Sequence, residues 1–440
     1  MKHLRILIIA LLFPLALHAQ SADQRIGKLL GSGDWFSLNR EYNQVKDSVQ
    51  SDVLRLMSET MLSAYFNRPE ELRASLQELI DNHSEEIGLQ NVCNILTLGA
   101  IAEGSNGRYA LAADRLKSVI DRAVAAGAPA GETGLESTFD YYNAVRDLPA
   151  PSITMRGKSV KVPFTIKDIP VSPSASAEMA RKMTGKNNVI WIPVTINGKK
   201  YEFILDTGAS YTALSESFAK EICAECVRDT IDLHGANYAG GTQTQRALIR
   251  KMSIGAAEID NLLAYVLSDN PLDTLVRADA ILGMDFIKLA GSLSIDFKHN
   301  TITFGRPVRS DGALPNLYLE TNNTLCLAAN VDLERQVLKF DTGSTLTDLS
   351  YSWYSTHKDV LDGLEEANVL LGTYGSTHSV SHLSMPDVTF NVAGKDAIVP
   401  NVLVYTSPDG NPTSGTVGLA LLRQFRKVIL DLKNMTLTVR

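Results

Sequence analysis

The tripeptide Asp-Thr-Gly occurs twice in this chain, at 206–208 and at 341–343, each time at the end of a largely apolar run. The two copies are 135 residues apart. At average residue usage, a chance copy is expected about once in ten chains of this length, so one copy alone would carry little weight. Two copies inside a longer repeat constrain the fold much more strongly.

The repeat extends well beyond the tripeptides. At the same offset, residues 201–215 align with 336–350, and residues 281–304 align without a gap with 416–439. Between these anchors the offset drifts to 140, where Asn261 matches Asn401, and then returns. Compensating insertions of this kind are typical of loops on a duplicated scaffold.

Composition narrows the class of protein. With 440 residues and 45% hydrophobic content, the chain can bury two or three cores. Its net charge is −7, and no basic stripe or aromatic and basic cluster is present, which excludes nucleic acid as a partner.

The first residues read as a secretory signal peptide spanning 1–19. A short positive start is followed by an apolar stretch over 6–17 and by the small residue Ala19, which predicts cleavage before Gln20. No later apolar run is long enough for a transmembrane anchor. We therefore expect an exported protein, periplasmic or secreted.

The four cysteines do not form the pattern of a disulfide scaffold. Cys93 and Cys326 lie in apolar settings and are expected to be buried singly. Cys223 and Cys226 have a two-residue spacing, for which a local disulfide or core packing are the alternatives. Without a second cysteine pair or a nearby histidine, we expect neither a metal site nor a cofactor.

The remaining chain divides by its pattern of apolar residues. Residues 20–150 show helical spacing and predict helical hairpins, with a stretch around Leu98–Ala113 that resembles a tetratricopeptide repeat. Residues 151–186 are rich in Pro, Ser and Ala and predict a linker with at most one strand. Short β-type runs then predict two β lobes, over 187–308 and 309–440.

The duplicated motif suggests a specific chemistry. Two carboxylates a few ångströms apart cannot both ionise easily, so one retains a proton while the other is a base. The ionised member can take a proton from water while the protonated member donates one to a peptide carbonyl, so that water attacks an amide bond. We therefore expect Asp206 and Asp341 to form a catalytic pair.

The groups around the pair have predictable roles. Gly208 and Gly343 permit tight turns that bring backbone N–H groups close to the carboxylates. Thr207 and Thr342 can supply buried hydroxyls that lock the two loops together.

The doubled motif, together with Ile281–Gly283 and its counterpart Val417-Gly418, resembles the aspartic proteases, specifically single chains with retropepsin-like lobes. The resemblance covers about residues 187–440 and implies an endopeptidase acting on a peptide or protein substrate. The expected architecture is multidomain α+β, with an N-terminal all-α helical-hairpin domain followed by a bilobal all-β aspartic-protease-like domain.

That family closes hairpin flaps over its substrate. Here the resemblance implies one flap carrying Tyr238 and Gly240 and another carrying Tyr374 and Gly375. The two tyrosines could also be ordinary surface aromatics of β hairpins.

The chain departs from the pepsin-like pattern after the glycines. Those enzymes usually have Ser or Thr there in both lobes, whereas this chain has Ala209 and Ser344. We expect Ser344 to support an ionised Asp341 while Asp206 holds the proton more readily. The working range should then lie in mild rather than strong acid.

Other functions are open to the same sequence. Actin-like ATPases and sugar kinases also duplicate an Asp-x-Gly loop, but the export signal and the short β runs after each motif disfavour them. No nucleophile elbow indicates a serine hydrolase. A catalytically inactive module that grips a peptide by strand addition stays open. The helical region could be a partner-binding scaffold, which we favour, or a spacer or an inhibitory pro-segment.

Overall fold

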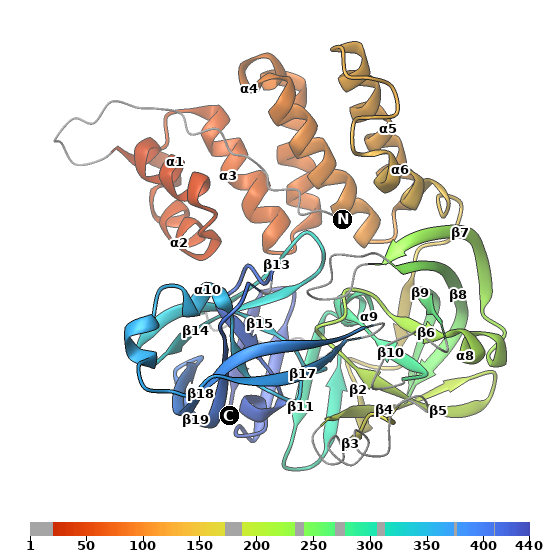
Figure 1. Ribbon diagram of the computed structural model, residues 1–440. Coiled ribbons are helices and arrows are strands. Elements are labelled where there is room, and N and C mark those ends of the chain that lie inside the picture. Colours follow the sequence, from red (N-terminus) through yellow and green to blue (C-terminus); the bar gives the residue numbers. More distant parts are fainter. Residues whose placement is uncertain are drawn as a thin grey trace. The chain divides into compact units, whose positions relative to one another are not determined.

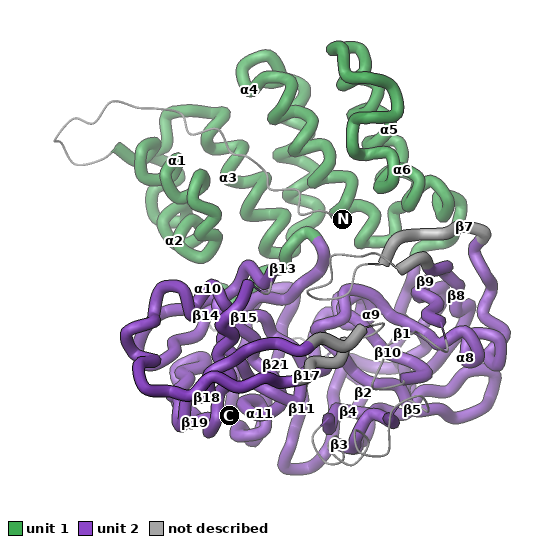
Figure 2. The backbone as a smooth tube through the Cα atoms, viewed as in Figure 1, with its two compact units in different colours: residues 1–150, 312–321 green, residues 151–311, 322–440 purple. Residues whose placement is uncertain are grey.

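The structure is a computed structural model. It describes residues 21–171, 187–233, 242–268, 278–305, 313–373, 376–408 and 410–440. The chain forms two compact units, one made of residues 1–150 and 312–321 and the other of residues 151–311 and 322–440 (Figure 2). The predicted signal peptide lies outside the described residues.

The first unit is helical, as predicted, and its helices follow one another in chain order (Figure 1). They are α1 (Ala22–Ser32), α2 (Trp35–Val45), the 3-10 turn η1 (Lys46–Ser48), α3 (Asp52–Tyr65), α4 (Pro69–Ser105), α5 (Tyr109–Ala125) and α6 (Glu136–Asn143). Within α4, Gly88 has a φ of 76°, which divides the segment into two helices. Only a residue without a side chain adopts that conformation readily.

Local sequence explains where several of these helices begin. Ser21 and Gln24 form a capping box at α1, and the side chains of Asp34 and Ser51 accept backbone N–H groups at the starts of α2 and α3. These contacts satisfy N–H groups that have no partner within the helix.

The stretch predicted to resemble a tetratricopeptide repeat joins α4 to α5. A Cβ atom on Gly99 would lie 2.5 Å from Leu76 Cδ1, and one on Gly104 would lie 2.0 Å from the Tyr142 ring. Ala112 and Ala113 are fully buried. These small residues allow neighbouring helices to approach closely, and the repeat assignment itself stays a prediction.

A segment distant in sequence completes the helical unit. Strand β13 (Leu317–Leu319) lies within residues 312–321. The ring of Tyr318 is buried, with its centroid 5.1 Å from that of Phe36 and 5.8 Å from that of Tyr65. The helical unit is therefore built from two parts of the chain that are separated by the whole first repeat.

The second unit is mostly β, as predicted. Its first sheet is ordered β1 (Ser152–Met155), β9 (Ala257–Leu267), β6 (Ala213–Ser215), β10 (Ala280–Leu282), β5 (Lys199–Leu205), β4 (Asn188–Ile196), β8 (Thr242–Ile254) and β7 (Glu225–Leu233), and β3 (Thr165–Asp168) also pairs with β4. The corresponding sheet of the second repeat contains, in order, β14 (Leu325–Val331), β15 (Glu334–Phe340), β20 (Gly415–Val417), β16 (Asp348–Leu349), β19 (Lys395–Tyr405), β18 (Ser376–Val392) and β17 (Ala367–Thr373). Short helices α8 (Glu216–Glu221), α9 (Met284–Ala290), α10 (Tyr351–Tyr354), η2 (Lys358–Leu361) and α11 (Leu419–Leu422) connect the strands.

The duplication is visible in the strand pairing. In the first repeat, β10 pairs in parallel with β5 and antiparallel with β6. In the second, β20 pairs in parallel with β15 and antiparallel with β16. The two aligned motifs thus occupy equivalent places at the ends of β5 and β15.

A further sheet joins the two repeats. Its order is β2 (Val160–Pro163), β12 (Thr301–Phe304), β11 (Ser292–Asp296), β21 (Lys427–Asp431) and β22 (Thr436–Val439). The equivalent strands β11 and β21 pair with each other, from Ser292 opposite Asp431 to Asp296 opposite Lys427. This shared sheet holds the two β lobes together away from the motif loops.

Residues 151–186, expected to be a linker with at most one strand, contribute more than that to this unit. Their described part contains β1, β2 and β3, each paired with a strand of the first repeat or of the joining sheet. The alternating Val160 and Val162 are both buried, which explains why this stretch pairs rather than remaining a connector.

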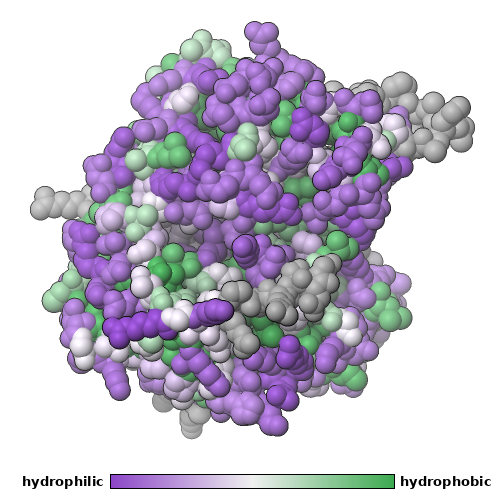
Figure 3. All heavy atoms as spheres, turned by 180° about the vertical axis from the view of Figure 1, so that it is seen from behind, coloured by the Kyte–Doolittle hydropathy of each residue, from purple (hydrophilic) through white to green (hydrophobic). Residues whose placement is uncertain are grey.

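Apolar groups on the surface are scattered. In the described part of the chain, no helix is long and apolar enough to cross a membrane. Exposed large apolar side chains such as Leu89, Leu333 and Ile398 lie in different parts of the chain, and the apolar residues in the face shown in Figure 3 form small separate groups. Single exposed apolar side chains are normal on folded proteins.

Replacing Tyr318 with alanine should lower the free energy of unfolding of the helical unit by about 3 kcal/mol, because it leaves a cavity beside Phe36 and Tyr65. The matched control, Tyr318→Phe, keeps the ring and loses only the hydroxyl that hydrogen-bonds to Glu320. Thermal unfolding followed by near-UV circular dichroism measures both, since Trp35 stacks on Tyr65. Equal midpoints for the wild type and Tyr318→Ala would contradict this role.

Candidate active site

Asp206 and Asp341 each follow the last residue of a central strand, β5 and β15 respectively. The N–H of Asp206 donates to the carbonyl of Leu282 at 3.0 Å, and the N–H of Asp341 donates to the carbonyl of Val417, also at 3.0 Å. Each aspartate is thus held by the strand that runs parallel to its own.

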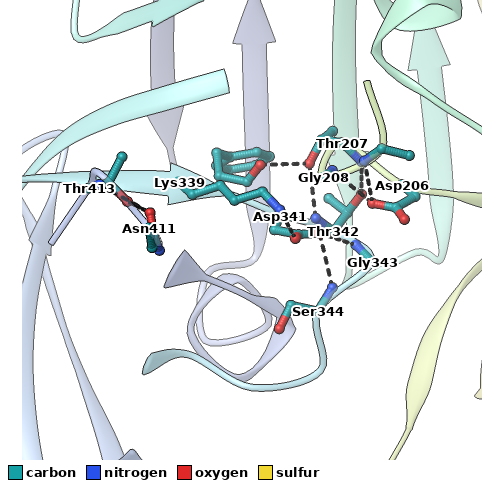
Figure 4. A network of polar contacts seen from close by, with 12 residues as sticks. Asp206, Thr207, Gly208, Lys339, Asp341, Thr342, Gly343, Ser344, Asn411 and Thr413 are labelled. Carbon is teal, nitrogen blue, oxygen red and sulfur yellow. Dashed lines mark hydrogen bonds and ion pairs between the residues drawn. The ribbon is translucent and has the colours of Figure 1, made fainter. Parts of the chain in front are cut away.

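The two motif loops approach each other closely (Figure 4). A Cβ atom on Gly208 would lie 2.2 Å from Asp341 Oδ2, and one on Gly343 would lie 2.3 Å from Asp206 Cγ. Any side chain at either position would displace the opposite carboxylate. The glycines are therefore required by the pairing itself, whereas neither has the positive φ that would make the turn alone require glycine.

The threonines lock the two loops reciprocally. Thr207 N donates to Thr342 Oγ1 at 3.0 Å, and Thr342 N donates to Thr207 Oγ1 at 2.9 Å. Each hydroxyl also donates across to the other lobe, from Thr207 to the carbonyl of Phe340 and from Thr342 to the carbonyl of Leu205. Both threonines are fully buried, so none of these groups can turn to water instead.

Backbone N–H groups support the two carboxylates in the same way. Asp206 Oδ1 accepts from the N–H of Gly208 at 2.7 Å and of Ala209 at 3.1 Å. Asp341 Oδ1 accepts from the equivalent Gly343 at 2.8 Å and Ser344 at 3.1 Å. The two carboxylates therefore accept equivalent backbone hydrogen bonds.

The Ser344 hydroxyl does not contact Asp341, although we expected it to favour the ionised form. It donates to the carbonyl of Leu346 at 2.9 Å. Ser344 supports Asp341 only through its backbone N–H, a contact that Ala209 provides equally to Asp206. The difference between Ala209 and Ser344 thus gives no preference for one protonated carboxyl over the other.

Lys339 is a site residue that the sequence reasoning missed. Its Nζ lies 2.9 Å from Asp341 Oδ2, and both side chains are largely buried (Figure 4). Lys339 precedes Asp341 by two residues on β15, and residues two apart in a strand share a face. This spacing was the available signal, but an isolated lysine in a strand more often points into solvent.

The two carboxyl groups have different pKa values. Burial, together with the charge of Asp341, raises the pKa of Asp206 to about 7. Burial would also raise the pKa of Asp341, but the charge and hydrogen bond of Lys339, together with Asp206 and the N–H of Gly343, outweigh it, so the pKa of Asp341 lies below its ordinary value. Each carboxyl group also contributes to the shift of the other's pKa. In this arrangement Asp206 carries a proton in mildly acidic solution while Asp341 is ionised.

The downstream glycines, Gly283 and Gly418, allow the chain to pack closely against the motif loops. A Cβ atom on Gly283 would lie 2.5 Å from the Tyr211 carbonyl carbon, and one on Gly418 would lie 1.8 Å from the Leu346 carbonyl oxygen. In the first repeat, Asp285 Oδ1 also accepts from both the N–H and the hydroxyl of Thr212. These contacts fix the chain just beyond each motif.

The predicted flap residues Tyr238, Gly240, Tyr374 and Gly375 lie outside the described residues.

All four cysteines are free thiols. Cys223 and Cys226 are exposed, so neither a disulfide between them nor core packing, the two expected alternatives, is found. Cys326 is buried, as expected, and Cys93 is half-buried. Cys223 has a φ of 55° just after α8, which places it in a tight turn.

Thr207→Val should lower the free energy of unfolding of the β unit by about 1–3 kcal/mol, because it leaves the buried Thr342 N–H and Phe340 carbonyl without partners. The control is Thr165→Val, the same change at an exposed position of β3. Urea unfolding gives both values. If the two variants unfold at the same midpoint, the threonine lock does not hold the lobes together.

Comparison with known proteins agrees with this geometry. Residues 192–289, which include the first motif, match the family model described as gag-polyprotein putative aspartyl protease. No curated protein sequence matches the chain.

Solved structures that are similar to this chain include two aspartic proteases. A retropepsin-like aspartic protease from Rickettsia conorii has 15% identity and a TM-score of 0.22, and the match covers 36% of this chain and 94% of that one. An aspartic proteinase from Irpex lacteus has 14% identity and a TM-score of 0.38, with 64% and 96% covered. The family-model match over residues 192–289 confirms the resemblance to aspartic proteases that the doubled motif predicts.

Proposed function

We propose that this protein is an exported aspartic endopeptidase in which Asp206 and Asp341 are the catalytic pair. The observation that carries the proposal is the pair itself, two carboxyl groups on adjoining loops that reciprocal threonine contacts hold together. The match of residues 192–289 to an aspartyl protease family supports the same reaction class.

In this proposal each carboxyl group has its own role. Ionised Asp341 takes a proton from a water molecule as the water oxygen bonds to the peptide carbonyl carbon, while Asp206 donates its proton to the carbonyl oxygen. When the resulting diol collapses, the carbon–nitrogen bond breaks. The nitrogen then takes the proton from Asp341, and a diol hydroxyl returns a proton to Asp206. Both groups recover their starting states.

The other parts of the proposal rest on the sequence and on the helical unit. Lys2, Arg5 and the apolar stretch that follows support export with cleavage before Gln20. Tyr238 and Tyr374 are proposed flap residues. Within the helical unit, closely packed hairpins support a scaffold that binds a protein partner, and the segment 312–321 disfavours a removable pro-segment because a cut near residue 150 would leave that part behind.

Cleavage of a peptide library, read by mass spectrometry, tests the reaction. The chain from Gln20 onward should cleave peptides, and Asp206→Asn and Asp341→Asn should each lower the rate by at least about 100-fold, because each removes a proton donor or acceptor. Asp362→Asn, at an exposed position, is the matched control and should leave the rate unchanged. A wild type that binds but never cleaves peptides would instead indicate an inactive peptide-binding module.

The rate should depend on pH in a way that follows from the two pKa values. It should rise through acid as Asp341 ionises, peak in mildly acidic solution, and fall as the pH passes about 7, where Asp206 loses its proton. Initial rates over pH 3 to 9 on one peptide, in buffers of equal ionic strength, measure the profile. A maximum in strong acid would contradict the assignment of acid and base.

A further inference from the structure

The repeat is broken at one set of neighbouring positions beside the candidate active site. In the first repeat, Ile204 on β5 lies in an apolar cluster with buried Val189, Trp191 and Ala278. The equivalent position in the second repeat, 135 residues later, is Lys339. A charged lysine cannot take the place of isoleucine in an apolar cluster, so this difference between the repeats requires another explanation.

The two positions beside it change in the same direction. In the first repeat, Ile204 is paired with Ile281, and Ile281 with Ala213. In the second, the register places Lys339 opposite Thr416, and Thr416 opposite Asp348. Three adjacent apolar residues in one lobe thus correspond to a polar row of Lys339, Thr416 and Asp348 in the other.

The polar row is largely buried, and its lysine has carboxylate partners. Lys339 contacts Asp341 at 2.9 Å, and Asp348 is only 7% exposed. Burial acts to lower the pKa of Lys339, but the attraction of Asp341, with contributions from Asp206 and Asp348, raises it, so the lysine stays charged. A buried ammonium without such partners would be strongly unfavourable.

The main chain cannot distinguish the two candidate catalytic groups, because Asp206 and Asp341 accept equivalent backbone hydrogen bonds. Among the described residues, the titratable groups that face Lys339 are Asp341 at the end of its own strand, Asp206 from the first lobe and Asp348 on β16, while β20 provides the neutral Thr416. Of the two candidate catalytic carboxylates, Lys339 forms its ion pair with that of its own lobe, Asp341.

We propose that Lys339 is a positioning residue that holds Asp341 as the ionised member of the pair and so leaves the proton on Asp206. This inference rests on the proposed peptidase function and fixes the direction of its proton transfers. Thr416 and Asp348 complete the polar row that allows a charged lysine to be buried at this place.

Lys339→Met removes the charge and keeps the length of the side chain, so it tests the proposal. The acidic limb of the rate profile should move upward by about 1–3 pH units, because Asp341 loses the opposite charge that favours its ionised form. Lys339→Arg keeps the charge and should retain the wild-type limb. Ile204→Met, the same replacement at the equivalent position of the first lobe, should leave the profile unmoved.

A second readout separates this inference from the proposed function. Carbon-13 NMR of aspartate-labelled protein follows the carboxyl titrations without any need for turnover, and Asp341→Asn identifies the Asp341 signal. Its midpoint should be higher in Lys339→Met than in the wild type. Circular dichroism verifies that the variant is folded, and Lys339→Gln, which keeps a polar group, replaces it in both measurements if it is not.

The outcomes are distinct. If the wild type does not cleave peptides but the Asp341 titration moves, the peptidase proposal fails while the assignment of Lys339 stands. If the wild type cleaves and Lys339→Met leaves both the acidic limb and the titration in place, the assignment of Lys339 is overturned. A variant that is faster at every pH with an unmoved titration would also overturn it, because Lys339 would then be an inhibitory contact.

Discussion

The reciprocal hydrogen bonds between Thr207 and Thr342 are the constraint on which the rest of the candidate site depends. They connect the first lobe to the second where each motif loop turns after its aspartate. Because the groups involved are fully buried, separating the loops would expose donors and acceptors that have no alternative partner. The shared pairing of β11 with β21 ties the same lobes elsewhere, so the distance between the carboxylates is set from two directions.

Symmetry and asymmetry in this site arise from different parts of the structure. Backbone contacts, the glycine turns and the threonine lock repeat almost identically in both lobes. The side chains on the strands beside the motifs differ, because the apolar row of the first lobe corresponds to the polar row of the second. A duplicated fold can therefore place two identical groups together while one of them acquires a different proton affinity from its own lobe.

The sequence predicted the elements whose signal is local or repeated. The two Asp-Thr-Gly motifs and their 135-residue offset predicted the duplicated β fold and the meeting of Asp206 with Asp341. The apolar spacing before Ala150 predicted the helices. What it missed depends on contacts between distant residues. Whether the Lys339 side chain points to solvent or to Asp341 depends on how the sheet packs. The Ser344 hydroxyl donates to the carbonyl of Leu346 in its own loop and not to Asp341. Strands β1 to β3 are four residues each, too short for their pairing to be visible in a Pro-rich stretch.

The discontinuous helical unit has a consequence for how the chain is made. A ribosome delivers the helices first, yet the residues around Tyr318 that pack on Phe36 and Tyr65 emerge only after the entire first β repeat. During that interval β13 does not yet cover the aromatic side chains of α2 and α3, while the chain grows at about 5–20 residues per second. The helical unit begins first in synthesis but cannot be finished until the first lobe has left the ribosome.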